Sequence, residues 1–230
     1  MYKKGDFHMH STCSDGGCSP EEVVLLAKKR NVDIISLTDH NTTLGVNDAI
    51  KCGDKIGVKV IPGVELSTRY NHARVHVLGY FKDDSYKDEL LLKILSLVKS
   101  HKISSIKHLM QNSINFKDCK DKLSVKAGIE ILRFFGATIV LAHPVLLLRS
   151  DFKEIIKLNF DGLEARYFSN REEDTEYFIN IAKERNLLYT AGSDFHKHNE
   201  MCRGHGLIGD VYLSEKEIYN FLIKGNLPYL

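Results

Sequence analysis

The sequence lacks the features of a membrane-spanning, secreted or disulfide-stapled protein. Its longest apolar runs, such as 145–148, fall far short of the ~20 residues that a membrane span requires. No apolar stretch of signal-peptide length follows the lysines near the N-terminus, so we expect a cytoplasmic protein with no membrane partner. The five cysteines are irregularly spaced and include no C-x-x-C pair, which predicts free thiols.

An excess of one charge is also lacking, because 32 Lys and Arg residues stand against 30 Asp and Glu residues, for a formal charge of +2. This balance excludes a protein that holds nucleic acid by bulk charge alone. Hydrophobic residues make up 43% of the 230 residues and charged residues 27%, which excludes long disordered tails, collagen and coiled coil. A chain of this length suits one domain of about 200–250 residues or two small ones.

Apolar segments of β character alternate along the chain with segments of helical character. Continuous apolar runs such as Ile34-Ile35 and Ile139-Val140-Leu141 suit strands that are covered on both faces, as in a parallel sheet. The candidate strands are 6–10, 33–38, 58–64, 74–80, 138–142, 160–165 and 187–191.

Helix starts are marked by two capping signals. Ser19 precedes Pro20 and Glu22, and Ser214 precedes Glu217 at the capping-box spacing. The alternation of strands and helices predicts an α/β fold, either closed like a barrel or open and doubly wound. The stretch 82–126 lacks the alternation, and we interpret it as a helical excursion from a single domain over 1–230.

Side chains able to bind metal gather at the predicted strand ends. Strand alternation places residues i and i+2 on one face, so His8 and His10 present two imidazoles to one point. In parallel α/β folds the C-terminal ends of the strands converge on one face, so we expect the candidates to share a site there. The nine candidates are His8, His10, Asp15, His40, Glu65, His76, His143, Asp194 and His196.

Histidine and carboxylate ligands without paired cysteines suit Mn, Fe or Zn at a hydrolytic site. Nine candidates exceed the about four to six ligands that one ion takes, so we expect two or three divalent ions. Such ions would attract a phosphate group, polarise its oxygens and lower the pKa of a bridging water. A non-enzymatic metal-binding module with closed coordination is an alternative.

The motifs that carry these residues also have a recognisable order. They are His8-Met9-His10-Ser11 with Ser14-Asp15-Gly16, Thr38-Asp39-His40-Asn41, Gly63-Val64-Glu65, His76-Val77-Leu78-Gly79, Ala142-His143-Pro144 and Gly192-Ser193-Asp194-Phe195-His196. In this order they resemble the motifs of the PHP (polymerase and histidinol phosphatase) superfamily over nearly the whole chain. The resemblance is closest to stand-alone phosphoesterases that act on nucleotides.

The resemblance implies a distorted (β/α)7 barrel with a trinuclear metal centre and a helical insertion that is shorter here than in related nucleotide phosphoesterases. By position it implies three ligand groups, which are His8, His10, Glu65 and Asp194 for one ion, Asp15, His40 and His196 for a second, and Glu65, His76 and His143 for a third.

The ligand set and the resemblance together predict an enzyme that hydrolyses the phosphomonoester of a nucleotide or of another small phosphorylated metabolite. The attacking group would be a metal-bridging hydroxide held at Glu65 and Asp194. Alternatives within related chemistry are an exonuclease-type phosphodiesterase on short oligonucleotides, a histidinol-phosphate phosphatase and a metal-dependent amide hydrolase. No obligatory protein partner is predicted.

Several neighbouring residues are further candidates. Arg166, just past the sixth predicted strand, could bind a substrate phosphate bidentately. Arg203 and His205, in the glycine-containing loop after the seventh, could also contact substrate. We expect Asp39 to orient a ligand imidazole and Tyr167 to act as a packing aromatic.

Overall fold

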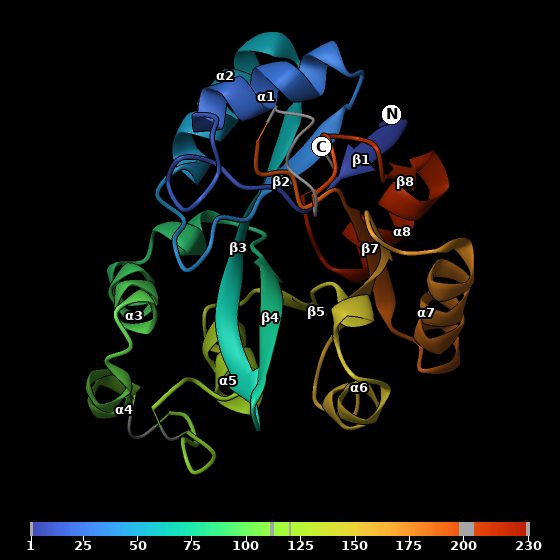
Figure 1. The fold of residues 1–230 in the computed structure, drawn as a ribbon. Helices are drawn as coiled ribbons and strands as arrows, with labels where there is room; N and C mark the ends of the chain where they lie inside the picture. Colours follow the sequence, from blue (N-terminus) through green and yellow to red (C-terminus); the bar gives the residue numbers. More distant parts are fainter. Residues whose placement is uncertain (1, 111–112, 120, 198–204, 229–230) are drawn as a thin grey trace.

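The computed structural model describes residues 2–110, 113–119, 121–197 and 205–228. Its centre is an eight-stranded sheet in the order β7-β6-β5-β4-β3-β2-β1-β8 (Figure 1). The strands are β1 (Lys4–Asp6), β2 (Ile34–Leu37), β3 (Lys59–Tyr70), β4 (Ala73–Tyr80), β5 (Thr138–Leu141), β6 (Gly162–Tyr167), β7 (Leu188–Gly192) and β8 (Leu213–Ser214).

The segment that follows β1 brings the two sides of the sheet together. The Phe7 N–H donates to the Ala191 carbonyl over 2.9 Å, and Met9 forms a parallel bridge with Phe195 beyond the end of β7. The sheet is thereby a nearly closed barrel. The prediction of an α/β barrel is confirmed, and the open doubly wound alternative is wrong.

Six of the seven predicted strands are present near their predicted bounds, but the first was placed too late, because β1 ends at Asp6 and the predicted range 6–10 mostly follows it. The sheet is also less uniformly parallel than the sequence suggested. β4 runs antiparallel to both β3 and β5, because the two-residue turn at 71–72 is too short for the crossover that parallel strands need. β3 also continues to Tyr70, well beyond its predicted end. β8 was not predicted, since two residues carry no periodic signal; it pairs antiparallel with β1.

The helices surround this sheet (Figure 1). Ser19 with Glu22, and Ser214 with Glu217, form the capping boxes that the sequence predicted. No helix in the part of the chain that the structure describes is long and apolar enough to cross a membrane. The helices are α1 (Pro20–Lys29), α2 (Val46–Ile56), α3 (Glu89–Lys99), α4 (Ile103–Met110), α5 (Val125–Phe134), α6 (Arg149–Ile155), α7 (Glu172–Glu184) and α8 (Glu215–Lys224), with 3-10 turns η1 (Asp84–Lys87) and η2 (Pro144–Leu146).

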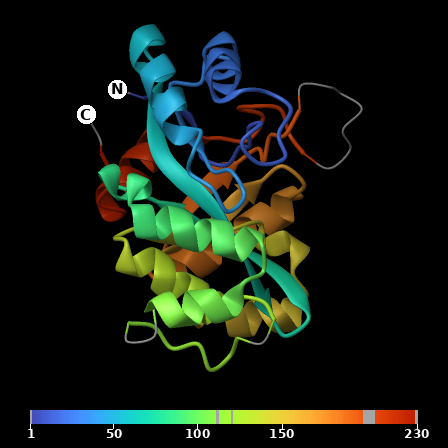
Figure 2. The same ribbon diagram turned by 90° about the vertical axis from the view of Figure 1, so that its left-hand side faces the viewer.

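The segment 82–126 forms η1, α3 and α4 and then leads into α5. Figure 2 shows α3 and α4 lying in front of the β3–β4 hairpin, on the side that faces left in Figure 1. Leu91, Ile94 and Leu95 recur at helical spacing on α3 and are buried in the same core cluster as Val75 and Val77 of β4. Burial of this apolar stripe fixes α3 against the barrel wall.

Gly192 allows the closest approach between strands at the barrel mouth. A Cβ at this position would overlap the carboxylate of Glu164 and the Cβ of His8. We therefore expect Gly192→Ala to lower the free energy of unfolding by about 3 kcal/mol, the upper end of the usual cost of overpacking. Urea denaturation followed by circular dichroism measures this change.

Gly136→Ala is the matched control. Gly136 has φ +75°, but nothing lies within 4 Å of the added Cβ, so only the strain of a left-handed alanine remains, about 1 kcal/mol. Equal losses in the two variants would contradict the overlap at Gly192.

Candidate metal centre

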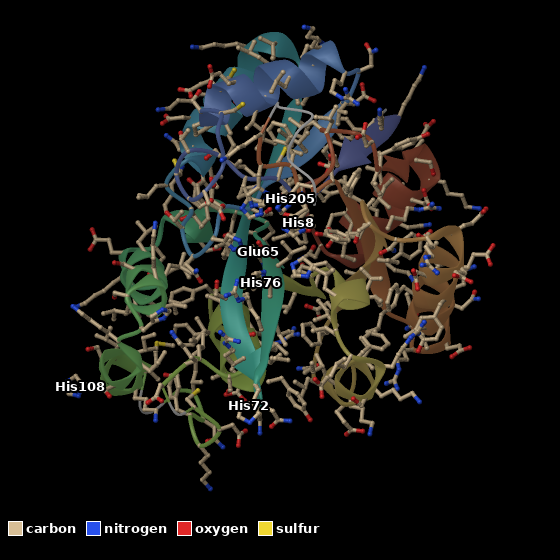
Figure 3. The ribbon with its side chains drawn as sticks, viewed as in Figure 1. His8, Glu65, His72, His76, His108 and His205 are labelled. Atoms are coloured by element: carbon tan, nitrogen blue, oxygen red, sulfur yellow. The ribbon has the colours of Figure 1, made fainter. Side chains whose placement is uncertain are left out.

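The nine predicted ligands converge at one mouth of the barrel. Figure 3 shows His8, Glu65 and His205 close together there, with His76 farther along the β3–β4 hairpin. In chain order the contributing side chains are His8 and His10 after β1, Asp15 in the loop 11–18, His40 after β2, Glu65 in β3, His76 in β4, His143 after β5, and Asp194 and His196 after β7.

The alternation of the first motif works as the sequence predicted. His8 and His10 are fully buried and face the centre, while Met9 between them is buried in a core cluster with Leu37 and Phe195. The two imidazole rings are 5.2 Å apart between centroids. One apolar residue therefore anchors the segment and directs both histidines to the same side.

The first group consists of His8, His10, Glu65 and Asp194, all buried. Glu65 Oε2 lies 3.3 Å from His8 Nε2 and 3.2 Å from His10 Nε2. Asp194 Oδ1 lies 3.3 Å and 3.1 Å from the same two nitrogens. Two carboxylate oxygens and two imidazole nitrogens thus enclose a single point.

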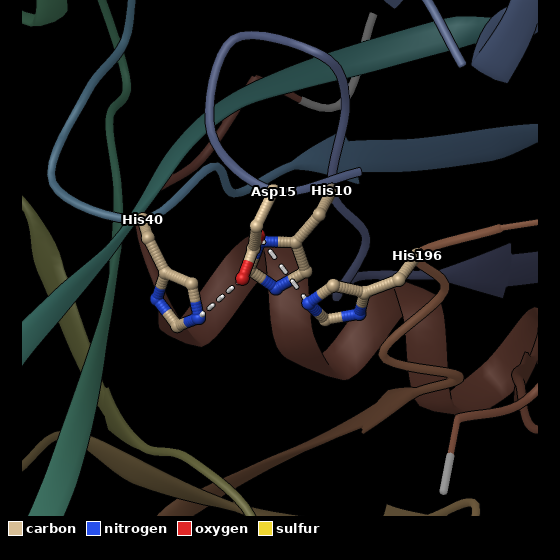
Figure 4. A group of neighbouring side chains, drawn as sticks. All are labelled: His10, Asp15, His40 and His196. Atoms are coloured by element: carbon tan, nitrogen blue, oxygen red, sulfur yellow. Dashed lines mark ion pairs between the residues drawn. The ribbon is translucent and has the colours of Figure 1, made fainter. Parts of the chain in front are cut away.

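The second group places Asp15 among His10, His40 and His196 (Figure 4). The Asp15 carboxylate oxygens lie 3.7 Å from His40 Nε2, 3.4 Å from His196 Nε2 and 3.6 Å from His10 Nδ1. Asp15 is 53% exposed, so this group opens toward solvent. Compared with the set that the family resemblance implied, it also includes His10.

The third group is centred on the other oxygen of Glu65. Its Oε1 lies 2.9 Å from His76 Nδ1 and 3.0 Å from His143 Nε2. His40 Nδ1 approaches Oε2 at 3.0 Å. Glu65 therefore belongs to two groups at once, as a bridging carboxylate would.

A second layer of side chains fixes the orientation of these groups. Glu164 lies 3.0 Å from His8 Nδ1 and accepts the His143 backbone N–H over 2.8 Å. Because an ionised carboxylate only accepts hydrogen bonds, this pairing places the proton of a neutral His8 imidazole on Nδ1, which would leave the lone pair of Nε2 facing the centre for a metal ion. The hydroxyl of Tyr167 donates to Asp194 Oδ2 over 2.9 Å.

Asp6, which sequence reasoning did not single out, holds the loop that carries Asp194. Its buried carboxylate accepts the backbone N–H groups of Ser193 at 3.1 Å and Gly209 at 2.8 Å. Burial raises the pKa of Asp6 to about 6, although these hydrogen bonds oppose the rise. Strand alternation could have singled out Asp6 from the sequence, since it places residues 6, 8 and 10 on the same face.

Asp39 differs from its prediction. Its carboxylate accepts the Ser11 N–H at 2.8 Å, the Ser11 hydroxyl at 2.7 Å and the Ser14 hydroxyl at 2.6 Å, rather than a hydrogen bond from an imidazole. Asp39 therefore positions the loop that carries Asp15. The two serines of the first motif, Ser11 and Ser14, were the sequence signal for this role of Asp39.

Arg166 is turned away from the centre. A register shift between Glu164 and Arg166 interrupts the alternation of β6, so that Glu164 and Tyr167 face the ligands. Arg166 instead pairs with Glu217 of α8 at 2.9 Å. The predicted phosphate contact assumed a regular strand, and the bulge removes the basis for it.

The two other predicted substrate contacts are Arg203 and His205. Arg203 lies outside the residues that the structure describes. His205 lies at the centre, where its Nδ1 is 3.2 Å from Asp194 Oδ2 and its ring is 3.9 Å from that of His196 between centroids. Its side chain is 37% exposed, so it stands at the mouth beside the buried ligands.

The backbone at the site is held in an uncommon conformation. His143 has φ +28° and Asp194 has φ +52°, both in the left-handed region that residues with a Cβ rarely adopt. Such conformations carry a strain of about 1–3 kcal/mol each and concentrate at functional sites. Here they aim two ligand side chains inward from the ends of β5 and β7.

The electrostatics of the centre fit bound cations. Burial opposes ionisation of Glu65 and Asp194, but the surrounding histidines hold the pKa of each well below its usual range. Burial lowers the pKa of His10, but Asp194 and Glu65 outweigh it and raise that pKa to about 9.

Several buried atoms at the centre lack a hydrogen-bond partner among the described residues. They are His8 Nε2, both ring nitrogens of His10, His40 Nδ1 and Glu65 Oε2. Buried polar atoms without hydrogen bonds are costly, and here His8 Nε2, His10 Nε2 and His40 Nδ1 lie 3.0–3.3 Å from Glu65 Oε2, while His10 Nδ1 faces Asp15 at 3.6 Å. Divalent ions held between them would satisfy these atoms, so the donor set fits metal.

The sequence is similar to a known protein family and to several known proteins. The model of the family described as the PHP domain matches residues 6–178. A 5'-3' exoribonuclease of Haemophilus influenzae is 35% identical over 129 residues, a match that covers 56% of this chain and only 42% of that protein.

A second relative is matched over most of its length. It is a phosphoribosyl 1,2-cyclic phosphate 1,2-diphosphodiesterase of Eggerthella lenta, 42% identical over 83% of this chain and 93% of that one. Among solved structures, one assigned as a metal-dependent phosphoesterase from Bifidobacterium adolescentis superimposes with a TM-score of 0.76 at 22% identity, covering 96% of both chains. This last likeness concerns the fold.

Stability of the metal-free protein should fall as the pH rises from about 6.5 to about 9. His10 binds its proton more tightly when folded, with a pKa of about 9 against about 6.5 unfolded. The contribution of His10 to the free energy of unfolding is therefore complete below the pKa of the unfolded state and is lost as the pH rises through the pKa of the folded state. This loss amounts to about 3 kcal/mol. Urea unfolding in EDTA at a series of pH values measures it.

Saturating Mn²⁺ is the control for this titration. Metal binding needs deprotonated imidazoles, so the loaded protein should gain stability over the same pH range. A metal-free stability that stays level or increases between these pH values would contradict the arrangement described.

Tyr167→Phe should weaken metal binding, because it removes the hydrogen bond that orients Asp194. Loss of such supporting contacts typically costs roughly 10- to 100-fold in metal affinity. Equilibrium dialysis against Mn²⁺ with elemental analysis measures the change. Tyr189→Phe is the matched control, since it loses a 2.9 Å hydrogen bond to Glu217, which lies outside the metal centre. Similar affinities for the two variants would show that Tyr167 has no such role.

Proposed function

The chain belongs to the PHP domain family of phosphoesterases, and from this premise we propose that it hydrolyses the phosphomonoester of a nucleotide or of another small phosphorylated metabolite. Two or three divalent ions, Mn, Fe or Zn, would be bound by the nine predicted ligands. The ligands are His8, His10, Asp15, His40, Glu65, His76, His143, Asp194 and His196.

The observation that carries this proposal is the overlap of the ligand groups. Glu65 and His10 each belong to two groups, so the groups lie side by side and not at separate sites. Bound divalent ions would lower the pKa of a water and polarise the oxygens of a phosphate placed between them. The partly exposed groups around Asp15 and His76 leave room for substrate, whereas a closed structural metal site would not.

The chain's own residues keep this centre in working geometry. Glu164 orients His8 and the backbone of His143, and Tyr167 orients Asp194. His205 is the partly exposed imidazole beside Asp194, so we assign it the contact with the substrate at the mouth. These contacts fix the ligands before substrate arrives, which is what transition-state stabilisation by electrostatics requires.

The cleft in front of the centre supports an organic phosphate with an apolar part. It has a volume of about 1140 Å³ and includes Glu65, Asp194 and His205 in its lining. Leu146 and Leu148 also line it, and they are 61% and 71% exposed. A nucleoside could cover these leucines while its phosphate meets the metal ligands.

Exonucleolytic cleavage of short oligonucleotides is a second candidate. It is supported by the exoribonuclease relative and by the volume of the cleft, about 1140 Å³, which would admit a phosphodiester as well as a monoester. The same metal chemistry serves both bonds, so the choice concerns the substrate only. Gel assays on end-labelled oligonucleotides separate the two activities.

With Mn²⁺ present, the protein should release phosphate from some members of a panel of nucleotides and sugar phosphates. His10→Ala and Asp194→Ala should lower that rate by about 100-fold or more, because each removes an electrostatic partner of the reacting group. His108→Ala, an exposed histidine of α4 far from the centre in Figure 3, should retain the wild-type rate. Equal rates in all variants would refute the proposed centre, and metal binding without turnover would favour a binding module.

A further inference from the structure

We propose that Arg166 is a positioning residue for the metal centre, because its ion pair with Glu217 of α8 holds β6 in the register that turns Tyr167 toward the ligands. The inference rests on the proposed function, since it concerns how the proposed metal ligands are oriented. It assigns a role to a side chain that is turned away from the centre and acts on it through the strand.

One extra residue in β6 decides which side chains face the metal centre. Glu164 and Arg166 lie opposite successive residues of β7, so Ala165 between them is the additional residue of a bulge. In a regular strand Glu164 and Arg166 would share a face, and Tyr167 would lie on the other. The bulge instead lets Glu164 and Tyr167 face the centre together, where both contact predicted metal ligands.

A regular pairing of β6 with β7 is the alternative to this arrangement. Bulges are rare between parallel strands, and the extra residue of a bulge is left unpaired. Without the bulge, every side chain after Glu164 would move to the opposite face of the strand. Tyr167 would then leave the centre, and Arg166 would take its side. Contacts outside the ladder must therefore stabilise the observed register.

The turn after β6 supplies the first of these contacts. Asn170 Nδ2 donates to the Ala165 carbonyl over 2.9 Å, and the Asn170 backbone N–H donates to the Tyr167 carbonyl over 3.0 Å. The carbonyl of the extra residue is thereby satisfied, as a buried polar group requires. These two bonds close the backbone around the bulge but involve no side chain of β6, so the side chains need a separate anchor.

Glu217 supplies the anchor on the outward side of β6. Arg166 Nη2 donates to Glu217 Oε1 over 2.9 Å, and the Tyr189 hydroxyl donates to the same oxygen over 2.9 Å. The other carboxylate oxygen accepts the backbone N–H and the hydroxyl of Ser214, over 2.9 Å and 2.6 Å. One carboxylate thus joins β6, β7 and the start of α8.

Helix α8 is a firm support for this ion pair. Glu217 is fixed by the capping box with Ser214, and apolar residues of α8 between 218 and 222 are buried in the core cluster that contains Ala191 of β7. The side chains of Arg166 and Glu217 are only 35% and 17% exposed. A regular β6 would withdraw Arg166 and leave a largely buried carboxylate without its charged partner, which is costly. The ion pair therefore favours the bulged register over the regular one.

The test measures the affinity for Mn²⁺ and for Zn²⁺ by equilibrium dialysis with elemental analysis. Arg166→Met keeps the unbranched apolar stem but removes the ion pair, so we expect affinity to fall by roughly 10-fold, the lower end for lost supporting contacts. Arg166→Lys keeps the charge and should retain most of the wild-type affinity. Added to Tyr167→Phe, Arg166→Met should cost much less than its own 10-fold, because both variants act on the orientation of Asp194.

Arg133→Met is the matched control. Arg133 is 39% exposed and pairs with Asp161 over 3.1 Å, just before β6 begins, so this variant loses a comparable ion pair away from the bulge. It should keep the wild-type metal affinity, although urea unfolding should show a similar loss of stability in both variants. Tyr189→Phe leaves the pair between Arg166 and Glu217 in place and should also keep the affinity.

A wild-type metal affinity in Arg166→Met would overturn the positioning role and leave the proposed function standing. Equal losses of affinity in Arg166→Met and Arg133→Met would overturn it as well, because they would report only a general loss of stability. If Arg166→Met does not fold, Glu217→Gln removes the charge of the partner with little change of shape and is judged by the same outcomes. Absence of Mn²⁺ and Zn²⁺ binding by the wild-type protein would instead overturn the proposed metal centre itself.

Discussion

The buried carboxylate of Glu65 lies within 3.3 Å of nitrogens from five histidines, and the arrangement of the barrel mouth depends on it. An ionised carboxylate in a protein interior is costly unless it is paired. In the metal-free chain the pairing comes from protonated imidazoles, as the raised pKa of His10 shows. Divalent ions can replace those protons, because both states place positive charge around the same two oxygens. Folding and the proposed metal binding would thus be coupled through one residue.

The barrel assembles this charge cluster from segments that are far apart in the sequence. Except for Asp15, whose loop is held by Asp39, each candidate ligand follows a buried strand or lies within one, so the hydrophobic packing of the strands fixes the positions of these polar groups. The nearly closed sheet matters here, since the segment after β1 must run beside the end of β7 for His8 and His10 to meet Asp194. Strained backbone at His143 and Asp194 is tolerated because the surrounding ladder holds both residues in place.

Whether a feature of the fold or the site could be predicted from the sequence depends on whether neighbouring residues carry its signal. The convergence of the candidate ligands at strand ends was predictable, because strand periodicity and the motif spacing act locally and the convergence of strand ends is general to such folds. Arg166 and Tyr167 were not, because a bulge between Glu164 and Arg166 exchanges the faces of β6 and leaves no mark in residue type. The position of Asp6 on the same face as His8, and the two serines of the first motif, were local signals. The partners that Asp6 and Asp39 find nevertheless depend on loops packing across the barrel mouth, which strand periodicity does not encode.

The β3–β4 hairpin has an inner part that the barrel supports and an outer part that extends beyond it. The ladder between β2 and β3 ends at Leu37 and Pro62, and beyond that point β3 pairs only with β4 among the strands. Glu65 lies just past this junction, close enough to the barrel to be held rigidly, whereas Arg69 and Arg74 lie at the far end of the hairpin. Substitutions there leave the ligand geometry supported by the barrel. The candidate metal ligands therefore depend on the barrel for their arrangement, whereas the outer hairpin and α3 lie outside that constraint.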